Sequence, residues 1–176
     1  MSEGSIQVGI VVGSDSDLPV IQETVNMLDS LGVTHEVTVA SAHRTPERTR
    51  AWLQGVTQRG AEVIIAGAGG AAHLPGVIAA ETILPVIGVP MPTLYFGGED
   101  SLYSIVQMPS GTPVAAMAVG KAGAANAGIF AAQILARKHE GVAEALRRFK
   151  TDLGSRVEKK AAKLEQLGIH KYVENM

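Results

Sequence analysis

Residues 35–48 read HEVTVASAHRTPER, and this stretch joins two kinds of local structure. Its first six residues alternate in character and predict a β-strand. Pro46 is typical of the first turn of a helix, where the missing N–H of proline leaves no hydrogen bond unmade. His43 and Arg44 therefore fall at the carboxyl end of a strand, which is the edge where open α/β sheets bind ligands. The stretch predicts both a fold and the place of a site.

Strands and helices alternate along the rest of the chain. The predicted strands cover residues 6–12, 35–41, 62–66, 85–89 and 113–119. The predicted helices cover residues 18–31, 46–60, 74–82, 101–107, 121–137 and 139–166. Five alternations favour a parallel, doubly wound sheet whose right-handed crossovers place helices on both faces. We therefore expect one α/β domain over residues 1–166, with its core at 6–137 and a tail at 167–176.

Composition narrows the class of protein. The chain has 176 residues, which suits one domain, and a net charge of −2, which gives no bias towards nucleic acid. It contains no cysteine, so disulfides and thiolate chemistry are excluded, as is usual in a reducing compartment. Residues 1–4 lack the basic start of a secretion signal, and no apolar run reaches membrane-spanning length. We expect a cytoplasmic protein without a membrane or nucleic-acid partner.

The helix predicted at residues 121–137 consists largely of Ala and Gly, and its alanines lie on all sides. A helix that is apolar all round is a buried helix. It can simply cover the sheet, but the lack of a clearly polar face favours a contact between subunits. We expect a homo-oligomer.

The sequence GSDSD at residues 13–17 follows the first strand and opens a helix. Gly13 permits a tight turn, and serine hydroxyls beside helix N-terminal amides suit a phosphate or carboxylate. Asp17 occupies a natural N-cap position but is also able to accept hydrogen bonds from sugar hydroxyls. The motif is neither a Walker A loop nor a dinucleotide fingerprint. A turn and a ligand loop both remain open interpretations.

His43 and Arg44 form a proton-transfer group beside an anion clamp. Imidazole gives and takes a proton near neutral pH, and guanidinium offers a planar fork to phosphate or carboxylate. At the end of the third predicted strand, residues 66–76 read AGAGGAAHLPG, and their glycines allow backbone N–H groups to approach a ligand. His73 is either a residue at a helix start or a second imidazole at the same sheet edge.

Residues 100–109, DSLYSIVQMP, predict a capped helical turn that is also placed to form a wall of the pocket. The chain has no metal-ligand spacing, no nucleophile elbow and no lysine poised for a Schiff base. From these residues we infer a phosphorylated small-molecule substrate and proton transfer by histidine, with neither a cofactor nor a metal.

Five ordered motifs resemble those of the class I N5-carboxyaminoimidazole ribonucleotide mutases of de novo purine biosynthesis. The matching stretches are GSDSD (13–17), SAHRTP (41–46), AGAGGAAHLPG (66–76), DSLYSIVQMP (100–109) and GKAGAANAG (120–128). The resemblance covers about residues 6–137. Residues 92–99 depart from it, because they are bulkier and more aromatic than the segment expected there.

The resemblance implies a three-layer, flavodoxin-like fold, a homo-octamer with active sites at subunit contacts, and coupling to an N5-carboxyaminoimidazole ribonucleotide synthase. It implies that the substrate's carboxylate leaves the exocyclic nitrogen as CO2 and is recaptured at carbon 4, with His43 moving the proton. Arg44 is then the phosphate ligand, and Ser14 and Asp17 also bind the ribonucleotide. The implied lining of the base and carboxylate pocket is Ser41, Ala42, Gly69, Gly70, Ala71 and His73.

Three other interpretations compete with the mutase. A CO2-dependent aminoimidazole ribonucleotide carboxylase shares the fold and the product, although SAHRTP and DSLYSIVQMP favour the mutase. A non-catalytic nucleotide-binding module predicts binding without turnover and no special role for His43. A dinucleotide-dependent oxidoreductase is disfavoured, since no acidic residue ends the second strand and the glycine fingerprint is missing.

Overall fold

Five parallel strands form one sheet in the order β2-β1-β3-β4-β5 in the computed structural model, which describes residues 5–176. The strands are β1 (Val8–Val12), β2 (His35–Val39), β3 (Val63–Ala68), β4 (Val86–Pro90) and β5 (Ala115–Ala116). The chain starts in the middle of the sheet, moves to β2 on one side, and then crosses β1 to β3 and continues outward. This confirms the predicted doubly wound sheet and places a topological switch at β1.

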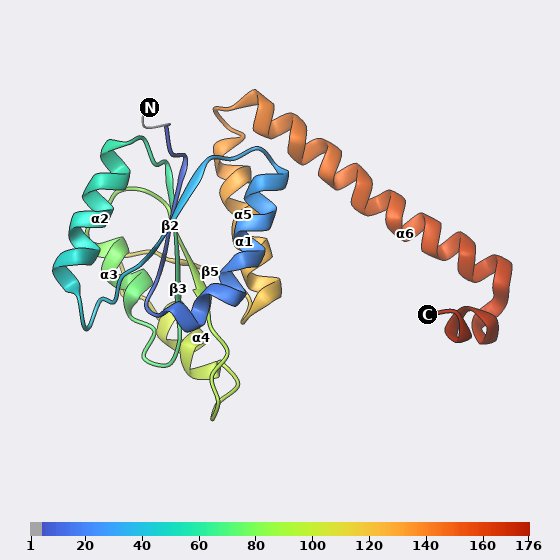
Figure 1. Cartoon of the computed structure of the whole chain (residues 1–176), viewed down its shortest axis with the longest axis horizontal. Coiled ribbons are helices and arrows are strands. Elements are labelled where there is room, and N and C mark those ends of the chain that lie inside the picture. Colours follow the sequence, from blue (N-terminus) through green and yellow to red (C-terminus); the bar gives the residue numbers. More distant parts are fainter. Residues whose placement is uncertain (1–4) are drawn as a thin grey trace.

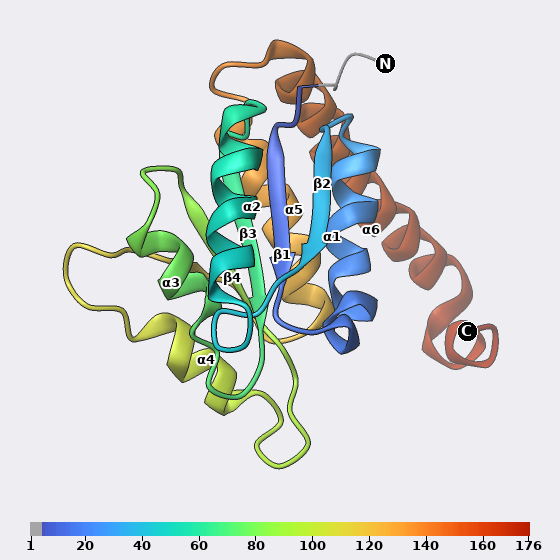
Figure 2. The same cartoon turned by 60° about the vertical axis from the view of Figure 1, so that its left-hand side comes forward.

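Helices cover both faces of the sheet (Figures 1 and 2). They are α1 (Leu18–Ser30), α2 (Pro46–Gln58), α3 (Leu74–Ala80), α4 (Glu99–Val106), α5 (Lys121–Leu135) and α6 (Glu140–Glu174). A short 3-10 turn, Asp15–Asp17, precedes α1. Helices α1 and α5 lie on one face, and α2, α3 and α4 lie on the other. The result is the predicted three-layer arrangement.

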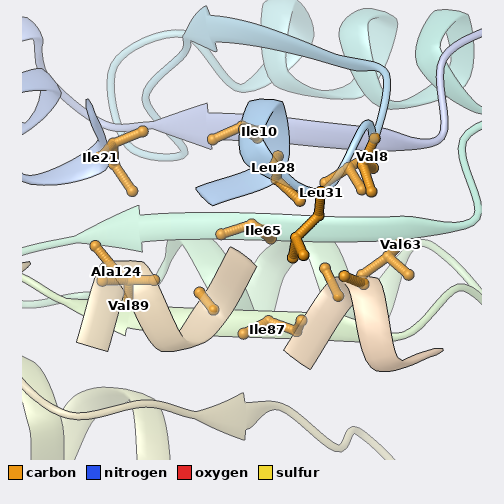
Figure 3. Packing of buried hydrophobic residues seen from close by; sticks show 14 of the residues in the cluster. Val8, Ile10, Ile21, Leu28, Leu31, Val63, Ile65, Ile87, Val89 and Ala124 are labelled. Atoms are coloured by element: carbon orange, nitrogen blue, oxygen red, sulfur yellow. The ribbon is translucent and has the colours of Figure 1, made fainter. Parts of the chain in front are cut away.

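Each face has its own hydrophobic core, because successive residues of a strand point to opposite sides. Val8, Ile10 and Val12 of β1 point towards α1 and α5, where Leu28 is also fully buried (Figure 3). Val11 points the other way, into the cluster under α2 and α3. All residues of β1, β3 and β4 are buried, as expected for central strands covered on both sides.

The boundaries of all five predicted strands differ from those observed, although β1 only begins two residues later and β4 lies only one residue later than predicted. The strand predicted at residues 113–119 pairs only at Ala115 and Ala116, because it is an edge strand and begins after a proline. The strand at 35–41 ends at Val39, where the turn that carries His43 begins. In contrast, β3 extends to Ala68, two residues beyond its predicted end at Ala66.

Helix α5 packs closely against α1 within the same chain. Its buried face consists of small residues, and Thr24 of α1 donates a hydrogen bond to the carbonyl oxygen of Ala124 at 2.7 Å. At Gly128 an added Cβ would lie only 3.0 Å from the carbonyl oxygen of Thr24. Asn126 and Gln133 lie on the exposed side. Packing inside the chain therefore accounts for the small residues, and the subunit contact stays a prediction.

Helix α6 is longer than the predicted 139–166 and projects from the domain (Figure 1). It continues to Glu174, with a break at Gly168, where φ is +71° and the helix changes direction. Only Val142 and Leu146 of this helix are buried. Within residues 5–176, no helix combines the length and apolar character needed to span a membrane. The prediction about a secretion signal concerns residues 1–4, which lie outside the described part.

We expect Gly123→Ala to lower the free energy of unfolding by about 3 kcal/mol, since overpacking against rigid backbone is expensive. The added Cβ would lie 1.6 Å from the carbonyl oxygen of Ala118. Gly154→Ala is the matched control, because a Cβ in that helix meets nothing within 4 Å. Urea denaturation checks both variants, and equal midpoints would contradict the packing argument.

Candidate active site at the carboxyl edge of the sheet

The loops that follow the first four strands surround one cavity of about 410 Å³. Most of its wall comes from the predicted motifs, and Met91, Pro92 and Thr93 after β4 complete it. The predicted residues in the wall are Ser14, Asp17, Ser41, Ala42, His43, Arg44, Gly69, Ala71 and His73. Gly70 is not among the lining residues. The sequence thus located three of the four loops. For the fourth it predicted a wall from residues 100–109, but none of these lines the cavity, because the residues directly after β4 take that place.

The first loop presents Asp17 to the cavity instead of using it as a helix cap. Ser14 caps the preceding 3-10 turn, since its Oγ accepts a hydrogen bond from the Ser16 N–H at 3.4 Å, whereas Asp17, at the N-cap position of α1, makes no capping bond. Burial raises the pKa of the Asp17 carboxyl above its ordinary value. Hydrogen bonds from Ser16 and the Ser14 backbone offset part of that rise, and the charge of Asp15 adds to it. Asp17 is therefore a half-buried acceptor facing the cavity.

The second loop is a closed turn that fixes Arg44. Thr45 N–H donates to the Ser41 carbonyl oxygen at 2.8 Å, and Ser41 N–H donates to Thr45 Oγ1 at 2.9 Å. The guanidinium of Arg44 donates from Nη2 to the carbonyl oxygen of Gly13 at 2.9 Å and from Nε to Ser41 Oγ at 3.4 Å. Arg44 thus joins the loops after β1 and β2 and brings a fixed positive charge to the cavity wall.

His43 and His73 contact each other across the cavity. The Nε2 of His43 lies 2.8 Å from the Nδ1 of His73, and the rings meet edge to face with centroids 4.9 Å apart. A hydrogen bond of this kind needs one donor and one acceptor, so the two facing nitrogens hold one proton between them. His73 makes no side-chain bond that caps α3, although it precedes that helix. The pair is suited to passing a proton to and from a bound molecule.

The third loop holds Gly70 away from the cavity. Its N–H donates to Ser101 Oγ at 3.0 Å, so this amide is not available to a ligand. Sequence reasoning missed Ser101, because its partner lies 31 residues earlier and no local pattern connects the two. Among residues 5–176, no three His, Asp or Glu side chains are grouped as metal ligands would be.

A model of the AIR carboxylase family matches residues 7–156. The chain belongs to the AIR carboxylase family. Among its relatives is a protein of Pyrococcus horikoshii named N5-carboxyaminoimidazole ribonucleotide mutase, 53% identical over 94% of this chain and 93% of the relative. A protein of the same name from Thermotoga maritima is 50% identical over 95% of this chain and 96% of the relative.

Two further proteins are similar to this member of the AIR carboxylase family. A phosphoribosylaminoimidazole carboxylase of Candida glabrata is 48% identical over 96% of this chain but only 29% of its own length. The crystal structure of Treponema denticola PurE is 26% identical, with a TM-score of 0.82 over 90% of this chain and 98% of that one. The similarity extends over the whole α/β domain and into α6.

We expect Asp17→Asn to change the pH dependence of stability in a defined direction. Because the folded-state pKa of Asp17 is raised, burying the ionised carboxylate destabilises the native enzyme above that pKa, and the penalty disappears as pH falls towards the ordinary value of 3.8. The melting temperature of the variant minus that of the parent is therefore largest near neutral pH and declines in acid. Asp152→Asn, at an exposed position of α6, is the control, since Asp152 does not contribute to the raised pKa of Asp17. A difference that grows as pH falls would contradict this account.

Proposed function

We propose that this chain is an N5-carboxyaminoimidazole ribonucleotide mutase of purine biosynthesis, an isomerase that yields 4-carboxy-5-aminoimidazole ribonucleotide. The observation that carries the proposal is its identity of about half to relatives of that name over nearly the whole chain. The cavity supports it, because a cation, a carboxylate and two imidazoles face the same space.

In the proposed reaction His43 donates a proton first and takes one back later. The bond between the exocyclic nitrogen and the carboxylate carbon breaks, CO2 is released within the cavity, and the nitrogen receives the proton of the His43 imidazolium. Carbon 4 then attacks CO2, and His43 removes the proton from that ring carbon, which restores aromaticity. One proton leaves and one returns, so a group that both gives and takes it suffices.

The proposed binding mode follows the charges of the cavity. Arg44, held by Gly13 and Ser41, binds the phosphate. Asp17 accepts hydrogen bonds from the ribose hydroxyls, for which a half-buried carboxylate is a strong acceptor, and the Ser14 hydroxyl is able both to donate to the ribose and to accept from it. The base and its carboxylate lie against five other residues of the cavity wall, Ser41, Ala42, Gly69, Ala71 and His73. Gly70 supports this wall from behind and does not touch the ligand.

We also propose that the enzyme works as a cytoplasmic homo-octamer and that a synthase forming its unstable substrate precedes it. The exposed apolar residues of α6, among them Val157, Ile169 and Val173, suit a contact with another subunit. Native mass spectrometry tests the assembly, since an octamer has eight times the 18.3 kDa mass of one chain. A monomer or dimer at micromolar concentration would contradict the octamer but would not contradict the proposed reaction.

A CO2-dependent aminoimidazole ribonucleotide carboxylase is the second candidate, because the Candida glabrata relative is named a phosphoribosylaminoimidazole carboxylase. We expect efficient turnover of N5-carboxyaminoimidazole ribonucleotide, followed by ultraviolet absorbance of the product. The competing arm supplies aminoimidazole ribonucleotide with bicarbonate. Efficient turnover in that arm alone would identify a carboxylase, and binding without turnover in both arms would identify a nucleotide-binding module.

We expect His43→Asn to reduce kcat by at least about 100-fold, the usual contribution of a proton-transfer group. Asparagine keeps a polar side chain, and the loops that hold Arg44 are unchanged, so binding of the ribonucleotide measured by calorimetry is retained. His35→Asn is the matched control, since His35 lies at the amino end of β2, away from the cavity. Full activity of His43→Asn would remove this residue from the mechanism.

A further inference from the structure

We propose that Ser101 of α4 is a positioning residue for the histidine pair. Its hydroxyl accepts a hydrogen bond from the Gly70 N–H and thereby fixes the turn that places His73 in contact with His43. The inference rests on the proposed function for its kinetic test, but its structural basis is independent of the substrate. Ser101 does not line the cavity, so it acts through the loop and touches no ligand.

Ser101 is fully buried, and its hydroxyl is satisfied in both directions. Its Oγ accepts the Gly70 N–H at 3.0 Å and donates to the carbonyl oxygen of Met91 at 2.8 Å. One hydroxyl therefore joins the loop after β3 to the end of β4. Removing it leaves a backbone N–H and a backbone C=O without this partner in a buried place, where unmade hydrogen bonds are unfavourable.

The turn from Gly70 to His73 depends on such an external partner because its own hydrogen bonds are short-range. Ala72 N–H donates to the Gly70 carbonyl oxygen and His73 N–H to that of Ala71, both at 2.8 Å. These bonds join residues two apart and close tight turns, which hold a chain less firmly than a helical ladder does. Gly70 also has a φ of +65°, which the surrounding contacts must maintain.

Ser104, one turn later in α4, makes a weaker contact with Gly70, at the carbonyl oxygen of that residue. Its Oγ lies 2.7 Å from the carbonyl oxygen of Asp100 and 3.2 Å from that of Gly70. A hydroxyl has a single proton, and the shorter contact is the usual bond of a helical serine to its own preceding turn. Ser101 is therefore the main anchor, and Ser104 is secondary.

The turn determines the histidine contact because His73 lies only three residues after Gly70. The Nε2 of His43 and the Nδ1 of His73 are 2.8 Å apart, so a shift of about 1 Å in the turn breaks their contact. Shifts of that size can reduce reaction rates by about 100-fold. Without its partner, His43 loses the orientation that directs its other nitrogen at the substrate. Ser101 thus affects the proton-transfer step more than the binding of the phosphate, which depends on Arg44.

The test compares Ser101→Ala with Thr24→Val, a matched control that also loses a fully buried hydroxyl bonded to a backbone carbonyl, but between α1 and α5. We expect both variants to melt at lower temperature. Only Ser101→Ala should lower kcat, by roughly 10- to 100-fold, with little change in KM and a shifted pH profile of kcat. The kcat of Ser104→Ala should lie between those of Ser101→Ala and the parent. Ser101→Thr, which restores the hydroxyl, should regain most of the lost kcat.

A second measurement needs no turnover. With ¹⁵N-labelled histidine, the ring signals of His43 and His73, assigned from His43→Asn and His73→Asn, should move in Ser101→Ala and stay in place in Thr24→Val. Unmoved ring signals, or an equal loss of kcat in both variants, would overturn the positioning role. A parent enzyme without mutase turnover would overturn the proposed function instead, and the ring signals would still decide the role of Ser101.

Discussion

The pairing of β1 with β2 on one side and β3 on the other is the constraint on which the site depends. Val12 lies opposite both Val39 and Gly67, so the three strands end at nearly the same level. Strands β2 and β3 are then about 10 Å apart, since neighbouring strands are spaced by a little under 5 Å. Side chains from the two outer loops reach over the end of β1 and meet there.

The contacts that cross this gap explain why residues distant in sequence form one cavity. Arg44 reaches back to Gly13, and His43 reaches across to His73. Below them, β1 and β3 are completely buried, so the loops stand on a rigid base. At Gly67 an added Cβ would lie 2.4 Å from the terminal methyl of Met91, so a larger residue would disturb the floor of the cavity. Close packing and site geometry are therefore linked at the strand ends.

The sequence predicted the features that depend on periodicity and on strand order. Parallel strands end at one edge, so the motifs at Gly13, His43 and His73 were expected to meet, and they line one cavity. The sequence did not predict features that depend on contacts between distant segments. The bond from Gly70 to Ser101 turns a glycine expected to line the pocket away from it. The short β5 likewise reflects its position at the edge of the sheet, because only two of its residues pair.

The histidine contact suits the proposed reaction because that reaction is balanced in protons. Moving a carboxylate from nitrogen to a ring carbon is an isomerisation that needs no external oxidant or reductant and leaves the net charge unchanged, and it requires one proton to be delivered and one to be recovered. A pair whose facing nitrogens hold a single proton keeps His43 in a defined orientation while its other nitrogen serves the substrate. A lone imidazole at this exposed edge would be free to rotate between proton donation and recovery. The partner ring, held by a turn that Ser101 anchors, allows both steps to use the same geometry.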